Sequence, residues 1–364
     1  MKKVLILCNS CIGLYKFRKE LLERLLEEKV EIYISTPFDN LEIIQELKKM
    51  NCQILETNID RRGINPIKDL KLLFNYFLLM KKVKPNVVLT YTIKPNLYGS
   101  IICRVLNISY INNITGIGTL FQNENILVKA IKAVYKFALK KSKCIFFQNQ
   151  YNLEYFKQNK LINKNYKLIN GSGVNLEKFN CEIKELDFPI KILFIGRIMQ
   201  EKGIEEFLEV AKKIKEKYKD KVEFNILGQY EEEKYKNIIK NLQNKAIVKY
   251  LGVSNDVRNE LKEVHCLISP SWHEGMSNVL LESGVMKRFL IASDIPGCRE
   301  IVINNKTGFT FEKQNIDDLE NKIEQFINLS EEEYEKYINS SYEHIKNNFD
   351  RKIVIDEYLK IINS

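Results

Sequence analysis

The stretch Ile190-Lys-Ile-Leu-Phe-Ile195-Gly196-Arg197-Ile-Met-Gln-Glu-Lys202-Gly203 joins an apolar run to a glycine turn that carries two cations. An apolar run that ends at glycine predicts a buried strand followed by a loop. Arginine, lysine and exposed backbone N–H groups are what a diphosphate binds, and this loop supplies all three. The stretch therefore predicts an anion site at the end of a buried strand.

A second stretch, Glu274-Gly-Met-Ser-Asn-Val-Leu-Leu-Glu282, contains two glutamates separated by seven residues. It follows the apolar run Val264–Ile268 and the breaker Ser269-Pro270-Ser271, which predict a strand and a loop. Helical periodicity begins near Ser277, so Ser277 or its neighbour Asn278 is the expected N-cap. Glu274 then lies just outside the helix and Glu282 about one turn inside it, so that two carboxylates flank one ligand.

Two glutamates at this spacing have another interpretation, in which Glu274 is a loop charge and Glu282 lies on a solvated helix face. The cations of the upstream loop favour the interpretation as a ligand site. Carboxylates accept hydrogen bonds from sugar and ribose hydroxyls, while the cations bind the diphosphate. Together the two stretches predict a site for a nucleoside diphosphate joined to a sugar.

If the sugar of such a ligand is transferred, the chemistry of that step assigns a role to each residue. The departing diphosphate gains negative charge, which Arg197 and Lys202 would neutralise as it develops. We assign Glu274 to a hydroxyl of the donor sugar and Glu282 to the ribose, and we predict Arg197, Lys202 and Glu274 as the catalytic residues. The predicted donor-binding residues are Gly196, Arg197, Lys202, Gly228, Glu274, Gly275, Met276, Ser277, Asn278, Val279 and Glu282.

The sequence points to no metal or cofactor. No Asp-x-Asp occurs in the chain, so nothing suggests a divalent cation beside the diphosphate. His273, next to Glu274, is a candidate catalytic group, but orientation of a neighbour or plain exposure on the loop is the favoured interpretation. The spacing Cys8-Asn-Ser-Cys11 is that of a redox motif, yet the scattered, mostly apolar settings of the eight cysteines favour reduced, buried thiols.

Apolar runs alternate with helical patterns along the whole chain, which predicts an α/β fold of doubly wound parallel sheets. An irregular stretch from about Val174 to Pro189 separates two such alternations. At 364 residues the length suits two domains. We expect residues 1–180 and 190–345 to form the two domains, followed by a C-terminal helical stretch at 346–364. Ligands of such sheets bind at the carboxyl ends of the strands.

The two loop motifs resemble the donor site of retaining family 4 glycosyltransferases of the GT-B type. The match continues at Pro296–Val302 and Asn305–Phe309. In the N-terminal half, Lys94–Gly99 and Asn113–Gly118 resemble a subset that acts in bacterial surface-glycan assembly. The resemblance covers nearly the whole chain and is stronger in the C-terminal half.

The resemblance implies two facing Rossmann-like domains with a cleft between them, an N-terminal one for the acceptor and a C-terminal one for the nucleotide sugar. It also implies that the C-terminal helix crosses back to the first domain. Transfer would be metal-independent and would retain the configuration of the sugar, with the donor phosphate assisting the acceptor proton. The implied acceptor is a polyprenyl-diphosphate-linked saccharide.

Residues for the acceptor are predicted from the equivalent edge of the first sheet. Three of these predictions have an alternative: Lys94 as a solvated lysine before Pro95, Arg18 as the partner of nearby glutamates at a helix start, and the Thr115-Gly116 turn as a plain loop. The predicted acceptor-binding residues are Gly13, Arg18, Lys94, Thr115 and Gly116.

Charge is distributed unevenly, although the net charge is only +10. Residues 1–187 hold 30 basic and 17 acidic residues, whereas the remainder holds 27 and 30. The helical patterns Ile67–Lys82 and 125–142 combine apolar residues with lysines, and the second has a stripe formed by Lys129, Lys132, Lys136, Lys140 and Lys143. Basic amphipathic helices are candidates for an anionic membrane surface, the alternative being a solvated lysine face. Nucleic-acid binding lacks a recognisable reading module.

The predicted function is transfer of a hexose or N-acetylhexosamine from a UDP-sugar to a polyprenyl-diphosphate-linked saccharide, in the synthesis of capsule, lipopolysaccharide O-antigen or glycoprotein glycan. No apolar run reaches the ~20 residues needed to span a bilayer. The expected location is the cytoplasm, at the inner face of the membrane. Alternatives are a glycolipid or soluble acceptor, a nucleotide-sugar epimerase, and a non-catalytic protein that binds a nucleotide sugar or a nucleic acid.

Overall fold

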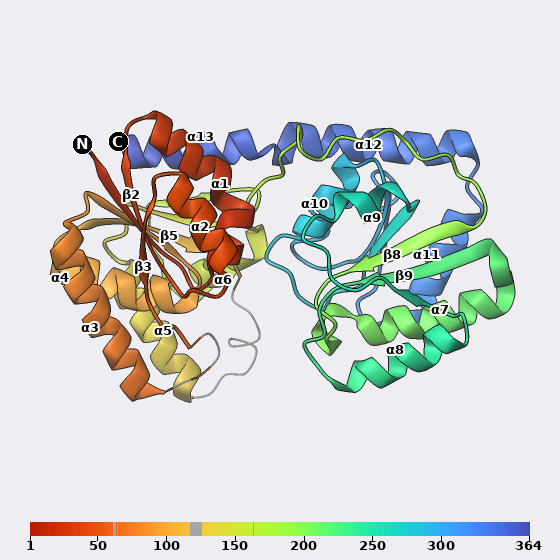
Figure 1. Cartoon of the computed structure of the whole chain (residues 1–364), viewed down its shortest axis with the longest axis horizontal. Helices are drawn as coiled ribbons and strands as arrows, with labels where there is room; N and C mark the ends of the chain where they lie inside the picture. The colour runs from red at the N-terminus through yellow and green to blue at the C-terminus, as the bar shows by residue number, and fades with distance from the viewer. Residues whose placement is uncertain (61–62, 64, 117–125, 163) are drawn as a thin grey trace. The chain divides into compact units, whose positions relative to one another are not determined.

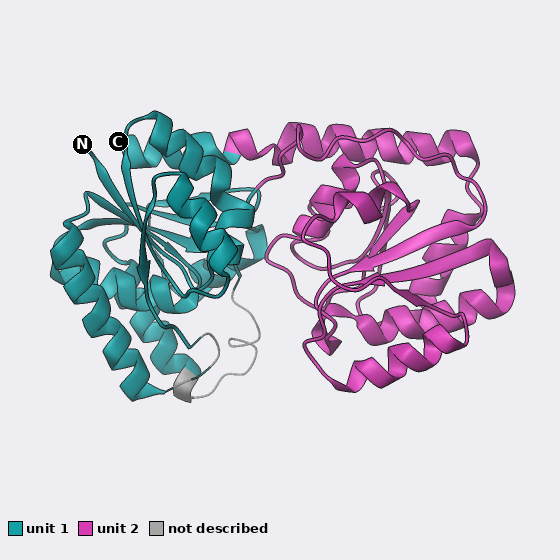
Figure 2. Cartoon of the chain, in the orientation of Figure 1, with its two compact units in different colours: residues 1–172, 354–364 teal, residues 173–353 magenta. Residues whose placement is uncertain are grey.

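The computed structural model describes residues 1–60, 63, 65–116, 126–162 and 164–364. The chain forms two compact units (Figure 2). Unit 1 contains Met1–Ser172 together with Val354–Ser364, and unit 2 contains Gly173–Ile353. Each unit is a parallel sheet with helices on both faces, so the prediction of two Rossmann-like α/β domains is confirmed.

Unit 1 has a sheet of order β3-β2-β1-β4-β5-β6-β7 in which all strand pairs are parallel (Figure 1). The strands are β1 (Lys3–Leu7), β2 (Glu31–Thr36), β3 (Gln53–Glu56), β4 (Val87–Tyr91), β5 (Ser109–Ile114), β6 (Cys144–Phe147) and β7 (Tyr166–Leu168). The helices are α1 (Cys11–Glu27), α2 (Leu41–Lys49), α3 (Pro66–Val83), the π-helical turn η1 (Pro95–Gly99), α4 (Ser100–Val105), α5 (Ile126–Leu139) and α6 (Gln150–Gln158).

Unit 2 repeats the design with the order β10-β9-β8-β11-β12-β13. Its strands are β8 (Ile190–Ile195), β9 (Val222–Leu227), β10 (Lys249–Tyr250), β11 (Cys266–Ser269), β12 (Phe289–Ser293) and β13 (Phe309–Phe311). Its helices include the 3₁₀ turns η3 (Gln200–Lys202) and η4 (Lys219–Lys221), with α7 (Ile204–Tyr218), α8 (Lys234–Asn244), α9 (Arg258–Lys262), α10 (Asn278–Val285), α11 (Ile316–Ile327) and α12 (Glu331–Phe349).

The alternation of side chains along a buried strand explains why helices cover both faces. On β1, Val4 and Ile6 belong to one hydrophobic cluster, whereas Leu5 and Leu7 belong to another. Both faces of a strand that is apolar at every position must be buried, and only a layer of helices on each side achieves this. The continuous apolar runs of the sequence therefore specify a three-layer parallel sheet.

Strand order reverses direction at one place in each sheet. In unit 1 the chain winds outward from β1 to β3 and then returns to β4 on the other side of β1. In unit 2 the same reversal lies between β8 and β11, which pair directly. Loops that leave the carboxyl ends of the two strands at such a reversal diverge, and ligands of open α/β sheets bind there.

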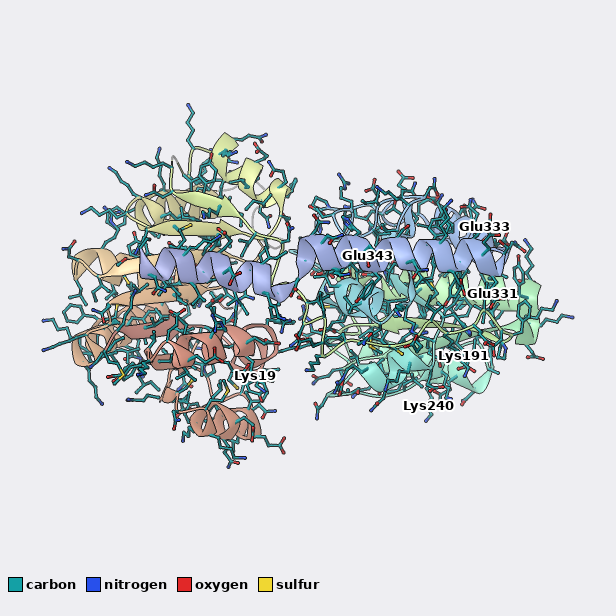
Figure 3. The ribbon with its side chains drawn as sticks, turned by 90° about the horizontal axis from the view of Figure 1, so that it is seen from above. Lys19, Lys191, Lys240, Glu331, Glu333 and Glu343 are labelled. Carbon is teal, nitrogen blue, oxygen red and sulfur yellow. The ribbon has the colours of Figure 1, made fainter. Side chains whose placement is uncertain are left out.

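The C-terminal stretch differs in detail from the sequence-based prediction. A single helical stretch was expected at 346–364, but α12 ends at Phe349 and α13 (Arg351–Asn363) begins after Asp350. Asp350 adopts an extended conformation and forms a bridge with Val174, which interrupts the helix. Exposed acidic residues line α12, among them Glu331, Glu333 and Glu343 (Figure 3).

Two strands of the second sheet are short. The apolar run Ile247–Leu251 contains only the two-residue strand β10, and β13 has three residues. Both lie at the edges of the second sheet, where strands are short. Among the residues that the structure describes, none of the helices is both long and apolar enough to cross a bilayer.

A buried histidine fixes the amino end of β11 to that of β8. His265 is 1% exposed, and its Nδ1 accepts a hydrogen bond from the backbone N–H of Lys191 at 2.9 Å. Its Nε2 lies 2.8 Å from Asp187 Oδ1. The ring therefore uses one nitrogen as an acceptor, which requires the neutral form. Burial lowers the pKa of His265 below its usual range, against the raising effect of the Asp187 hydrogen bond.

Because the folded state disfavours the charged imidazole, the free energy of unfolding should fall as the pH falls below about 6.5, where the unfolded histidine takes up a proton. In His265→Asn the side-chain oxygen can still accept from Lys191 N–H, so this variant should lose the pH dependence. His265→Ala should cost about 1–3 kcal/mol at pH 8, because it leaves a backbone donor unpaired. Urea unfolding between pH 5 and 8 tests this, and an unchanged pH profile in His265→Asn would contradict it.

Candidate active site

The two loop motifs leave adjacent strands of unit 2. β8 ends at Ile195 and leads into Gly196-Arg197, whereas β11 ends at Ser269 and leads into the loop that carries Glu274. Since β8 and β11 are the pair at which strand order reverses, their loops lie on either side of the predicted ligand position. The fold thus brings together the two stretches that the sequence indicated.

The two loops touch through backbone. Gly203 has a left-handed φ of 74°, and a Cβ atom at this position would lie 2.0 Å from the carbonyl oxygen of Pro270. Only glycine permits both the conformation and the approach. The contact holds the turn η3, which ends at Lys202, against the start of the Ser271–Ser277 loop. The backbone N–H of Trp272 donates to the carbonyl of Glu201 at 2.9 Å and adds a second attachment.

This attachment pairs the predicted diphosphate ligand with the predicted sugar ligand. Lys202 Nζ lies 2.5 Å from Glu274 Oε1, and the two side chains are 22% and 17% exposed. Ser271 Oγ donates to the same carboxylate oxygen at 2.9 Å. A partly buried cation and carboxylate that lie this close neutralise one another. A bound anion could replace Glu274 beside Lys202, and hydroxyl groups could replace Lys202 beside Glu274.

A third loop packs against the backbone of the loop that carries Glu274. The backbone N–H of Ser277 donates to the carbonyl of Gly297 at 2.9 Å. Gly297 has a φ of 86°, and a Cβ there would lie 2.8 Å from the carbonyl oxygens of both Glu274 and Gly275. The stretch Pro296–Val302, recognised in the sequence only by resemblance, therefore packs against the Glu274 loop.

Helix α10 begins where the sequence predicted. Its N-cap is Ser277, whose side chain makes no capping hydrogen bond, so the first-turn N–H groups depend on other partners. Glu282 is 2% exposed, which excludes a solvated helix face. Asn278 Oδ1 is buried without a hydrogen-bond partner among the described residues. Met276 is buried, and Val279 packs against the hydrophobic cluster of this face.

The backbone also packs closely where Gly228 meets Gly196. Gly228 follows β9 with a φ of 153°, and a Cβ there would lie 1.7 Å from the carbonyl oxygen of Gly196. Arg197 is more exposed than Lys202 and lies 3.6 Å from Glu231. His273 is exposed, and partial burial of the ring together with the nearby Lys313 lowers its pKa despite the acids around it. The exposure of His273 agrees with the interpretation that this side chain is simply exposed on the loop.

Unit 1 contains the predicted acceptor residues, and the structure gives several of them structural partners. Gly13 lies in the first turn of α1, where its N–H donates to Ser10 Oγ at 3.3 Å. Arg18 lies in the middle of α1 rather than at its start, and it is 5% exposed. Its guanidinium packs 5.1 and 5.5 Å from the ring centres of Tyr91 and Tyr358. It does not pair with the nearby glutamates, so that alternative is wrong.

Lys94 is not a solvated lysine. Its Nζ lies 2.6 Å from Asp69 Oδ1, and the two side chains are 13% and 14% exposed. The neighbouring Asn96 is buried, accepts from Thr90 Oγ1 at 2.6 Å and donates to the carbonyl of Asn113 at 2.8 Å. The Lys94–Gly99 motif thus ties β4 to β5 and to α3.

Thr115 and Gly116 follow β5, and Gly116 has a φ of 154°. Gly118, part of the same motif, lies outside the described residues. Just before this turn, Asn113 accepts a hydrogen bond from the hydroxyl of Tyr358 on α13. The C-terminal helix therefore helps to hold the strand end that carries the turn.

The redox interpretation of Cys8 and Cys11 loses support. Both thiols are buried and neither forms a disulfide, and burial, with Asp39 nearby, raises the pKa of Cys11 to about 12. A thiol with so high a pKa is a poor nucleophile. No cluster of three or more His, Cys, Asp or Glu residues suited to a metal ion occurs in the described part of the chain.

Comparison with known proteins decides the family. Residues 177–344 match the family described as glycosyl transferases group 1, and residues 3–149 match glycosyl transferase 4-like. The Escherichia coli enzyme named UDP-Gal:alpha-D-GlcNAc-diphosphoundecaprenol alpha-1,3-galactosyltransferase is 30% identical, over 72% of this chain and 71% of its own length. The protein is a glycosyltransferase of group 1, of the GT-B type.

A second relative of this glycosyltransferase aligns along almost its full length. It is the N,N'-diacetylbacillosaminyl-diphospho-undecaprenol alpha-1,3-N-acetylgalactosaminyltransferase of Campylobacter jejuni, 26% identical over 98% of this chain and 96% of the relative. Among solved structures, Anabaena HepE in complex with UDP and glucose superposes with a TM-score of 0.81 at 13% identity over the whole of both chains. A glycosyltransferase from Rickettsia africae gives 0.80 at 20% identity, covering 99% of this chain and 97% of that one. These structures share the fold.

Two residues beside the candidate site of this glycosyltransferase escaped the sequence analysis. Glu206 is buried on α7, and Trp272 donates its indole N–H to it at 2.7 Å. The sequence signal was faint, because Glu206 sits in a run of charged residues at a helix start and Trp272 lies in an irregular loop. A tryptophan in a loop beside a predicted catalytic glutamate was the one available indication.

The backbone contact at Gly203 predicts a specific sensitivity to substitution. Gly203→Ala should lower the free energy of unfolding of unit 2 by about 2–5 kcal/mol, because it combines left-handed strain with a clash against Pro270. Gly252→Ala is the matched control. It has a φ of 83° but nothing within 4 Å of a new Cβ, so it should lose only about 1–2 kcal/mol. Urea unfolding followed by Trp272 fluorescence measures both, and equal losses would contradict the contact.

Proposed function

We propose that this glycosyltransferase moves a hexose or N-acetylhexosamine from a UDP-sugar to a polyprenyl-diphosphate-linked saccharide during assembly of a bacterial surface glycan. The observation that carries the proposal is the ion pair between Lys202 and Glu274 at the point of strand reversal in unit 2. A nucleotide sugar offers the replacement partner for each member of the pair. Its diphosphate suits Lys202 and its sugar hydroxyls suit Glu274.

In this proposal the cations carry the charge that develops as the sugar departs. Arg197 and Lys202 neutralise the leaving diphosphate, with no metal required, and Glu282 binds the ribose. The Gly275–Ser277 backbone approaches the sugar and the diphosphate, because glycine allows a close pass. Retention of configuration, with the donor phosphate assisting the acceptor proton, follows the family resemblance. No protein base is assigned.

The names of the relatives support the substrate classes. The Escherichia coli relative is named for UDP-Gal and a diphosphoundecaprenol-linked acceptor, and the Campylobacter jejuni relative for an N-acetylgalactosaminyl group and a diphospho-undecaprenol acceptor. A Staphylococcus aureus relative is named as a capsular polysaccharide biosynthesis glycosyltransferase. We therefore propose galactose and N-acetylgalactosamine as the first sugars to test. Unit 1 would bind the acceptor, through Gly13, Arg18, Lys94, Thr115 and Gly116.

We further propose that unit 1 lies on the anionic inner surface of the cytoplasmic membrane, where such an acceptor is found. Four apolar side chains of α3 at spacings of three and four residues are exposed, with exposed lysines such as Lys71, Lys81 and Lys82 on the same helix. The apolar side chains are Ile67 (81%), Leu70 (68%), Phe74 (59%) and Leu78 (50%). An apolar stripe beside lysines is complementary to a lipid interface with anionic head groups.

Substitution of Glu274 separates sugar recognition from nucleotide binding. Glu274→Gln should lower transfer by about 100-fold or more, because an ionised acceptor for the sugar is lost. Its affinity for UDP should be unchanged or higher, because Lys202 is released from its partner. Release of UDP from UDP-galactose and UDP-N-acetylgalactosamine, with and without undecaprenyl-diphosphate saccharides, measures transfer, and calorimetry measures UDP binding.

Glu263→Gln, an exposed glutamate on the same unit, is the control. If Glu274→Gln loses UDP binding, or if it keeps full transfer activity, the assignment of Glu274 to the donor sugar is wrong. If the wild type does not bind UDP, the proposed function itself is contradicted.

Removal of the apolar stripe should weaken membrane binding. Phe74→Ser with Leu78→Ser should lower partitioning onto phosphatidylglycerol vesicles by about 10-fold or more, since each buried side chain contributes about 1.5–3 kcal/mol. Ile238→Ser, at a comparably exposed residue of α8, should have no effect. Sedimentation with vesicles at two salt concentrations measures the partitioning. Equal binding by wild type and double variant would argue against this surface.

A further inference from the structure

The tryptophan of the donor loop is anchored on a buried carboxylate. Trp272 Nε1 donates to Glu206 Oε1 at 2.7 Å, and Glu206 is 6% exposed. The second carboxylate oxygen, Oε2, is buried and has no hydrogen-bond partner within the described part of the chain. Burial of a carboxylate with few partners is costly, so the bond to the indole is the principal compensation that the side chain receives.

The position of Glu206 links it to the other donor loop. Glu206 is the third residue of α7, which begins directly after the Lys202-Gly203 turn. The amino end of a helix favours negative charge, because its first N–H groups lack intrahelical partners. The same helix start therefore fixes Lys202 on one side and the carboxylate that receives Trp272 on the other.

The backbone of the loop that carries Glu274 is attached on both sides of that residue. The loop is attached at Trp272 N–H, which donates to Glu201, and at Ser277 N–H, which donates to Gly297. Glu274 lies between these two attachments and two residues after Trp272. On the amino-terminal side the indole anchors the loop to α7, and Ser271 Oγ donates directly to the Glu274 carboxylate. A displacement of about 1 Å at a reacting group can reduce the rate by about 100-fold, so this anchor matters for the placement of Glu274.

We propose that Glu206 is a positioning residue that acts through Trp272 to present the Glu274 carboxylate to the donor sugar. This inference rests on the proposed function, since it concerns the same donor site. Binding of the nucleotide depends on Lys202, Arg197 and Glu282 and is independent of the anchor. Recognition of the sugar and its transfer depend on the anchor.

The sequence supplies a probe for this arrangement, because Trp272 is the only tryptophan in the chain. Its fluorescence reports on the donor loop alone. A donor sugar that binds beside Glu274 changes the surroundings of the indole, whereas a general change of stability elsewhere leaves the emission of the folded protein unaltered.

The test compares Glu206→Leu with Glu206→Gln in the full chain. Leucine removes the acceptor and leaves the indole N–H unpaired, whereas the glutamine oxygen can still accept from it. Glu206→Leu should lower kcat by about 10- to 100-fold and abolish the emission change on addition of UDP-galactose or UDP-N-acetylgalactosamine, with the Kd for UDP within about threefold of wild type. Glu206→Gln should restore both readouts.

Glu209→Leu, an exposed position one turn later on α7, is the matched control and should behave as wild type. Trp272→Phe should lose as much activity as Glu206→Leu, and the double variant should lose no more than either, because one bond is removed in all three. Equal losses in Glu206→Leu and Glu206→Gln, or wild-type kcat in Glu206→Leu, would overturn the positioning role while UDP binding persists. Failure of the wild type to bind UDP would overturn the proposed function as well.

Discussion

The close approach of Gly203 to Pro270 is the constraint on which the proposed donor site depends. A side chain at position 203 would collide with a carbonyl oxygen at 2.0 Å, so the two loops that leave β8 and β11 can meet only through bare backbone. This contact sets the separation between Lys202 and Glu274, which come from stretches 72 residues apart in the sequence. The chemistry of the site follows from that separation.

The charges of the candidate site are satisfied internally. Lys202 and Glu274 pair with each other while both are largely buried, which avoids leaving either as an uncompensated charge. In the proposed function a nucleotide sugar would exchange these partners, because its phosphate would replace the carboxylate and its hydroxyls would replace the ammonium. Binding would then cost one ion pair and return two sets of charge-assisted hydrogen bonds. We therefore expect selectivity for an intact nucleotide sugar, because only a ligand with both parts would restore both partners.

Much of this arrangement could be predicted from the sequence, for a physical reason. Buried parallel strands require continuous apolar runs, and anion loops require glycine and cations, so both leave local signals. Interactions between distant segments leave none. The ion pair of Lys94 with Asp69, the interruption at Asp350 and the bond between Trp272 and Glu206 each depend on the folded arrangement. Lys94 was thus open to interpretation as a solvated residue, although the structure buries it.

A crystal structure of the protein with UDP bound would test the proposed donor site directly. We expect the diphosphate to lie beside Gly196 and to contact Lys202 Nζ, the ribose to contact Glu282, and Lys202 and Glu274 to lie beyond hydrogen-bond distance of each other. UDP bound at another place, or an intact Lys202–Glu274 pair with the phosphates away from Lys202, would contradict it.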